Sequence, residues 1–251
     1  LLFTISIFSK VMAASIIGPM IMLDYWYSRK FTWKLIAEKV PFVLLAIWVG
    51  LKQVAAVDET GTIDKSNIYS VTEKLLIACR NLIYYPIKTL VPTKLSAFYP
   101  YPPKGPGISL PSEFYICGVL VLVIGLLLFL SAKKTKLFIF CGGFFVSTII
   151  LVLQYVPVGP TMFSERYSLV PGIALAYLIA HGIVYLLETK PQFKQAIYGS
   201  VGVYFIFLFV TTYKRCNVWQ DSLTLWDDTI AQFPNVATAL NNRGKYYGEH
   251  L

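Results

Sequence analysis

Four long apolar runs without Asp, Glu, Lys or Arg restrict how this chain can fold. Each has roughly the 20 residues that a helix needs to cross about 30 Å of hydrocarbon. Two further spans are expected, at 40–57 and in the opening stretch that ends near Tyr25. Only 14% of the residues are charged, against about 25% in soluble domains. The sequence therefore predicts an all-α fold, a polytopic transmembrane helical bundle of about six spans. The four runs are 114–132, 137–156, 168–187 and 195–213.

Lysine and arginine residues gather in alternate short connections between these runs. Cytoplasmic loops carry an excess of both, so we expect these connections on the cytoplasmic side. The loops 58–111 and 157–166 and the tail after Tyr213 would then face outward, and only Lys214 and Arg215 resist this scheme. Topology accounts for the net charge of +9, and we expect no nucleic-acid partner. The basic groups are Arg29, Lys30, Lys34 and Lys39; Lys133, Lys134 and Lys136; and Lys190 and Lys194.

The four cysteines show neither metal-ligand spacing nor a disulfide framework. The sequence also contains no HExxH motif, no P-loop and no Ser-His-Asp grouping that we can identify. We therefore expect no metal-binding residues in this sequence.

The external loop 58–111 has two parts. In SVTEKLLIACRNLIYY (70–85), Val71, Leu75, Ala78, Cys79 and Leu82 share one helical face, and only Ile77 is out of place. This pattern predicts an amphipathic helix in the membrane interface. The Pro- and Tyr-rich remainder, which includes YPYP, predicts a rigid loop over the outer face of the bundle. A structural role and a substrate-covering role both remain open for it.

The tail after Tyr213 is polar and helical, with a break at FPN. If Pro234 closes a 34-residue tetratricopeptide repeat, Trp226 falls at the aromatic position of the second helix. Leu240, Gly244 and Tyr247 then fall at the apolar, glycine and tyrosine positions of the next repeat. The alternative is an ordinary helical hairpin. A single repeat cannot bury its own face, so we expect more repeats to follow.

Glu165 and Arg166 form an adjacent acid and base inside VGPTMFSERYSLVPG (158–172), where one apolar run ends and the next begins. A planar guanidinium at the membrane surface can hold a phosphate bidentately. The neighbouring carboxylate could orient that arginine or a substrate hydroxyl. An interfacial ion pair whose arginine reaches the lipid headgroups is the alternative.

Lys10 lies between two apolar stretches, deep within a span or at a helix break. An ammonium there should face a water-filled cavity or a carboxylate and not lipid. The topology puts Lys10 in the outer half of its helix, on the side of Arg166. Two cations converging on one outward cavity would suit a lipid-linked phosphate; a lysine reaching the outer interface is the alternative.

Six stretches stand in the order seen in one known family: FSK, MIMLDYW, LSAFYPYP, SERYSLVPG, WQDSLTLWDDTI and FPNVATALNNRGKYY. On these stretches the chain resembles membrane proteins that join a C-type glycosyltransferase bundle to a tetratricopeptide-repeat tail. That family includes the eukaryotic transmembrane and tetratricopeptide-repeat O-mannosyltransferases and bacterial relatives. The resemblance covers nearly the whole chain, and SERYS with its following proline and YPYP are its more specific pieces.

The resemblance implies transfer of a sugar, with mannose as a candidate, from a polyprenyl-phosphate donor to a protein acceptor on the extracytoplasmic face. It implies inverting chemistry whose use of a divalent metal varies. The acidic catalytic residue of the family lies in a first external loop, which we expect upstream of Leu1, so no catalytic residue is assigned here. Glu165 and Arg166 match their motif and are assigned to the donor phosphate. Lys10 joins them as a candidate, although Val11 follows it where the family commonly has glutamate.

These inferences lead to one expected organisation. Residues 1–213 form the transmembrane bundle, and 214–251 form an extracytoplasmic linker and the beginning of the repeats. The helical patterns are incomplete at both termini, so we expect further segments there. The expected partners are membrane lipid, the lipid-linked sugar donor and a protein bound through the tail, in a bacterial inner membrane or the endoplasmic reticulum. The alternatives are a non-catalytic membrane scaffold that binds proteins through its repeats, and a transporter, for which we see no internal symmetry.

Overall fold

The computed structural model describes residues 1–59, 68–105, 108–155 and 160–250, and in these ranges it is helical apart from one two-stranded ribbon. Its elements in order are α1 (Leu2–Ser9), η1 (Val11–Ile16), α2 (Ile17–Trp26), α3 (Trp33–Ala37), α4 (Val40–Glu59), α5 (Val71–Leu90), β1 (Tyr99–Pro100), α6 (Ser112–Ser131), α7 (Leu137–Ile149), η2 (Ile150–Val152), β2 (Thr161–Phe163), η3 (Glu165–Ser168), α8 (Leu169–Thr189), η4 (Pro191–Phe193), α9 (Lys194–Val218), α10 (Ser222–Gln232) and α11 (Ala237–His250), where η marks a 3-10 helix.

Three helical segments of the described chain are long and apolar enough to cross a membrane: Ser112–Ser131, Glu165–Thr189 and Pro191–Val218. Two more, Val11–Trp26 and Leu137–Val152, are apolar but shorter. The helices expose large apolar side chains, such as Leu122, which is 74% exposed, and Phe209, which is 71% exposed. Apolar surface of this extent is typical of a chain in contact with lipid. The all-helical, membrane-compatible fold is therefore confirmed, while the number of six spans stays a prediction.

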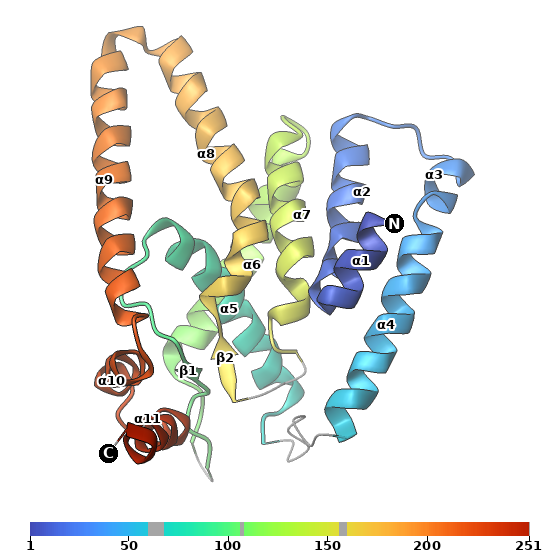
Figure 1. The fold of residues 1–251 in the computed structure, drawn as a ribbon. Coiled ribbons are helices and arrows are strands. Elements are labelled where there is room, and N and C mark those ends of the chain that lie inside the picture. Colours follow the sequence, from blue (N-terminus) through green and yellow to red (C-terminus); the bar gives the residue numbers. More distant parts are fainter. Residues whose placement is uncertain (60–67, 106–107, 156–159, 251) are drawn as a thin grey trace.

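The basic connections lie together at one end of the molecule. Figure 1 shows the α2–α3, α6–α7 and α8–α9 connections at the top of the view, which we call the basic end. The β1–β2 ribbon and the α10–α11 hairpin lie at the bottom, which we call the ribbon end. This grouping is the one that the positive-inside rule requires of alternate loops. The basic end is defined by Arg29, Lys30, Lys133, Lys134, Lys136, Lys190 and Lys194.

Small residues allow α2 and α7 to approach closely. A Cβ atom on Gly18 would lie 2.1 Å from the Cβ of Ser147, and one on Gly143 would lie 2.2 Å from the sulfur of Met22. In the first contact a glycine of α2 faces α7, and in the second a glycine of α7 faces α2. The two contacts are four residues, or about one helical turn, apart on each helix. Such close approach is typical of helix packing inside membranes, where van der Waals contact replaces the hydrophobic effect between helices.

We expect Gly18→Ala to destabilise the protein by about 1–2 kcal/mol, because the new methyl group would overlap an atom held next to the α7 backbone. Gly143→Ala is the matched control, since the Met22 thioether can swing away and alanine favours a helix by about 1 kcal/mol over glycine. Thermal unfolding in detergent micelles measures both. Equal melting temperatures for the two variants would contradict the close contact at Gly18.

α5 begins with a capping box, as its sequence permits. The Ser70 hydroxyl accepts a hydrogen bond from the Glu73 N–H at 3.3 Å, and the Glu73 carboxylate accepts one from the Ser70 N–H at 2.8 Å. The helix continues through Pro86 to Leu90, five residues past the predicted end at Tyr85. A proline inside a helix removes one hydrogen bond and adds a steric conflict. Pro86 nevertheless does not end α5.

α5 packs on the rest of the protein through a side that includes Ile77. Ile77, the residue that broke the predicted apolar face, is only 1% exposed, whereas Val71 is 75% exposed and Leu75 is 51% exposed. β2 and α6 cover the helix at Ile77, and the placement of the apolar face in the membrane interface stays a prediction. Asn81 is fully buried there, and its amide donates a hydrogen bond to the carbonyl of Met162 at 2.9 Å.

The tail forms an antiparallel helical hairpin that packs on the loop before β1. Asp221 caps α10 by accepting a hydrogen bond from the Thr224 N–H at 2.8 Å, and the turn to α11 contains the predicted break at Pro234. Gln232 donates a hydrogen bond to the carbonyl of Leu95 at 2.8 Å. The hairpin is thus established, and a repeat array stays a prediction. Its apolar contact with the loop is made by Phe98, Trp226, Ile230, Phe233, Val236 and Ala239.

Arg215, which did not fit the charge scheme, has a structural partner in the tail. Its Nη1 atom donates to a carboxylate oxygen of Asp228 at 2.7 Å. The side chain is 16% exposed, so this cation joins the end of α9 to α10.

Candidate functional site

The β1–β2 ribbon brings together the two most specific pieces of the sequence, YPYP and SERYS. Tyr99 pairs with Phe163 and Pro100 pairs with Thr161 in antiparallel register. The Thr161 hydroxyl adds a hydrogen bond to the Tyr99 carbonyl at 3.1 Å. η3 follows β2 after Ser164 alone, so the ribbon places the external loop beside Glu165 and Arg166. The sequence placed both pieces on the outer side but did not predict this pairing.

Glu165 is bound to the external loop. Its Oε1 atom accepts hydrogen bonds from the Tyr99 hydroxyl and from the Ser96 N–H, the latter at 3.3 Å. Lys88 and Arg215 lie near enough to act on the carboxylate electrostatically. The carboxylate therefore holds the loop against the start of α8, in a partly buried position.

Tyr99 is suited to act as a permanent donor in this contact. Burial, followed by the hydrogen bond to Glu165, raises the pKa of the Tyr99 phenol well above its usual value. The hydroxyl stays protonated at any physiological pH. Burial also lowers the pKa of Lys88, whose ammonium donates to the carbonyls of Thr93 at 2.6 Å and Lys94 at 3.2 Å.

Arg166 and Lys10 both lie close to the ring of Tyr167. The guanidinium carbon of Arg166 lies 5.2 Å from the ring centroid, and the Lys10 ammonium lies 5.4 Å from it. Both distances fall within the range of cation–π interactions. Lys10 is extended, with φ −156° and ψ 119°, at the break between α1 and η1. A helix break is one of the two positions that the sequence predicts for Lys10, and the convergence of Lys10 and Arg166 on one cavity stays a prediction.

Glu165 and Arg166 do not form an ion pair with each other. In the ranges that the structure describes, no ion pair joins Arg166 to a carboxylate, and the Glu165 hydrogen bonds go to Tyr99 and Ser96. Arg166 is exposed, and its guanidinium donors are available to an anion. The sequence predicts that the Glu165 carboxylate orients Arg166 or a substrate hydroxyl, and it assigns no role to Tyr167.

Three participants were therefore missed: Tyr99, Ser96 and Tyr167. YPYP and SERYS had each been singled out, and an aromatic ring directly after an arginine is a signal for cation–π contact. The contact between Glu165 and Tyr99 joins residues that are 66 positions apart in the sequence. A local sequence pattern gives no signal for such a contact.

A second feature is an apolar cavity of about 400 Å³ among α5, α6, α7 and α8. Leu175 and Leu178 line it from α8, nine and twelve residues after Arg166. At 1.5 Å per residue, Leu175 lies about 13 Å along the helix from Arg166. The other walls include Leu82, Pro86, Leu128, Cys141 and Phe145.

Metal-ligating side chains do not gather anywhere in the described ranges: no group of three or more His, Cys, Asp or Glu residues lies close enough to hold an ion. All four cysteines are free.

No family model, no curated protein and no solved structure matches this chain.

Proposed function

We propose that this chain belongs to an integral-membrane glycosyltransferase that moves a sugar from a polyprenyl-phosphate donor to a protein acceptor at the ribbon end of the bundle. The observation that carries the proposal is that Lys10 and Arg166 both lie close to the ring of Tyr167. These two cations come from elements about 150 positions apart, and a phosphate is the ligand that such a pair suits best. The resemblance on SERYS and YPYP points to the same donor.

The chemistry needs a positive charge where the leaving group forms. As the glycosidic bond breaks, the phosphate oxygen gains negative charge, and a cation fixed beside it lowers the barrier. Tyr167 would hold both cations in place between substrates, because its ring attracts each of them. Arg166 has no carboxylate partner among the described residues, so its donors need not be released from an ion pair when the donor binds.

The lipid tail of the donor also needs a place in the bilayer. The apolar cavity among α5–α8 begins about 13 Å along α8 from Arg166. An isoprenoid chain anchored by its phosphate at Arg166 would reach that depth. The catalytic acid would come from a segment outside 1–251, as the resemblance implies, and the docked tail hairpin would present a protein acceptor beside the loop that contains Tyr99.

A transfer assay tests this function. The full-length protein in detergent, given polyprenyl-phosphate mannose and other polyprenyl-phosphate sugars with a range of unfolded polypeptides, should transfer label to protein. Absence of transfer from every donor by correctly folded protein would favour the scaffold alternative, in which the tail only recruits partners.

Within that assay, Lys10→Ala should lower transfer about tenfold, since a hydrogen bond to a charged group contributes about 1.5 kcal/mol or more. Lys245→Ala is the matched control, because Lys245 is an exposed lysine on α11 at the same end of the molecule, 72% exposed. Equal activity of both variants would remove Lys10 from the donor site.

A further inference from the structure

A second site lies at the basic end of the molecule, away from Arg166. There, a pocket of about 780 Å³ opens between α2 and the segment formed by α3 and the first turns of α4. We propose that it binds an anionic glycerophospholipid of the surrounding membrane, with the phosphate at Lys136 and an acyl chain along the apolar wall. This proposal depends on the membrane location and not on the transferase activity.

The wall of the pocket is apolar over a length that suits an acyl chain. Ile17 and Ile21 line it from α2, and Val40 and Leu44 line it from α4. From Asp24 at its upper end to Ile17 the pocket follows seven residues of α2, about 10 Å. Its volume falls in the range of about 300–1,000 Å³ that is typical of ligand sites. Ile21 is 48% exposed and Leu44 is 62% exposed, so lipid can reach the wall from the side.

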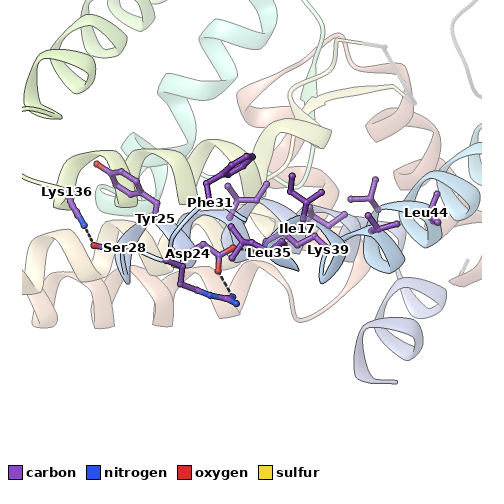
Figure 2. A pocket seen from close by; sticks show the side chains of 14 residues that line it. Ile17, Asp24, Tyr25, Ser28, Phe31, Leu35, Lys39, Leu44 and Lys136 are labelled. Atoms are coloured by element: carbon purple, nitrogen blue, oxygen red, sulfur yellow. Dashed lines mark hydrogen bonds and ion pairs between the residues drawn. The ribbon is translucent and has the colours of Figure 1, made fainter. Parts of the chain in front are cut away.

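The charged side chains of this pocket extend from Lys136 at one end to Asp24 and Lys39 near its middle. Figure 2 shows Lys136, Ser28 and Tyr25 at one end, and Leu44 at the other. The polar end lies at the α2–α3 and α6–α7 connections, where the headgroups of a bilayer would lie, and Leu44 points away from it along α4. An apolar wall with a polar end is the shape that an amphiphile requires.

Ion pairing within the pocket leaves one cation uncompensated. Arg29 contacts Asp24 and Glu38, each at 2.9 Å, and Lys39 also contacts Asp24. Lys136 instead donates to the hydroxyl of Ser28 and lies 5.7 Å from the ring centroid of Tyr25.

In the described part of the chain Lys136 contacts no carboxylate. A lipid phosphate at this position could bind the Lys136 ammonium and accept a hydrogen bond from the Ser28 hydroxyl, and no ion pair would have to break. Arg29, which is 46% exposed, can turn a remaining N–H toward the same phosphate.

The neighbouring charges select the kind of lipid. Lys30, Lys34, Lys133 and Lys134 belong to the same connections and add positive charge around the opening. Basic pockets between membrane helices on this side attract anionic headgroups. The positive choline group of a zwitterionic lipid would be repelled here, so the pocket should prefer phosphatidylglycerol or phosphatidylserine to phosphatidylcholine.

Native mass spectrometry of the full-length protein in mild detergent tests the site. With equal amounts of phosphatidylglycerol and phosphatidylcholine added, we expect phosphatidylglycerol adducts to be retained preferentially. Lys136→Gln should lower that retention about fivefold, since one lysine near an anionic lipid is worth about that much. Lys136→Arg should restore it. Lys190→Gln removes the same charge from the α8–α9 connection, which does not line the pocket, and should change retention little.

A second variant tests the apolar wall independently of charge. Ile21→Trp fills the pocket and should reduce retention of both lipids while gel filtration and the melting temperature of lipid-free protein stay as in the wild type. Equal retention of the two lipids by wild type, or equal losses for Lys136→Gln and Lys190→Gln, would overturn the proposal. Unchanged retention in Ile21→Trp would also overturn it, and would indicate that another protein segment covers the pocket.

Discussion

Replacing Arg166 by alanine in the full-length protein is expected to lower sugar transfer by about 10²–10³, the usual effect of removing one preorganised donor from a developing anion. Arg166 is exposed, packs on Tyr167 and makes no ion pair among the described residues. Its removal should therefore leave expression, membrane insertion and melting temperature unchanged. Steady-state transfer with polyprenyl-phosphate mannose measures the loss.

Two further variants make the result specific. Arg166→Lys keeps the charge but loses the planar pair of donors, so it should recover only part of the activity. Arg243→Ala removes an arginine of α11 that pairs with Asp227 at the same end of the molecule, and this variant should transfer normally. Wild-type turnover by Arg166→Ala would exclude a role at the donor phosphate.

The second large effect is expected at Glu165, and it concerns stability. Glu165→Ala removes the acceptor shared by the Tyr99 hydroxyl and the Ser96 N–H. Hydrogen bonds to a charged group contribute about 1.5–3 kcal/mol each, so we expect a loss of about 3 kcal/mol in the free energy of unfolding. The external loop should also become accessible to protease near Ser96. Thermal unfolding and limited proteolysis in detergent measure the two effects.

Two further variants distinguish a role of Glu165 in anchoring the external loop from a role in orienting Arg166. Glu165→Gln keeps an acceptor oxygen and should cost less than alanine. Tyr99→Phe combined with Glu165→Ala should cost less than the sum of the single changes, because both remove the same contact. If Glu165 instead orients Arg166, then Glu165→Gln would lower transfer while the melting temperature stays constant, and our interpretation would be wrong.

The sequence predicted well those features that depend on local composition. The apolar runs at 114–132, 168–187 and 195–213 became helices long enough to span a membrane. The three basic connections lie at one end, and Lys10 sits at a helix break. Each of these follows from properties of neighbouring residues: length of apolar helix, charge of a connection, or loss of helical hydrogen bonding.

Prediction failed where a side chain's environment depends on distant segments. Ile77 lay outside the predicted apolar face of its helix, and its burial could not be predicted because the residues that cover it belong to another part of the chain. Arg215 contradicted the charge pattern because its partner, Asp228, lies in the next helix.

The sequence by itself determined the helical class of this protein and the apolar helices that are compatible with a membrane, because these depend on what each residue is. Only the tertiary structure decided how the charged residues are used. It turned Glu165 toward Tyr99 and away from Arg166, placed Lys10 and Arg166 on one ring, and left Lys136 without a carboxylate beside an apolar pocket. The reason is that hydrogen bonds and ion pairs act over a few ångströms, and only the packing of helices sets which groups come that close.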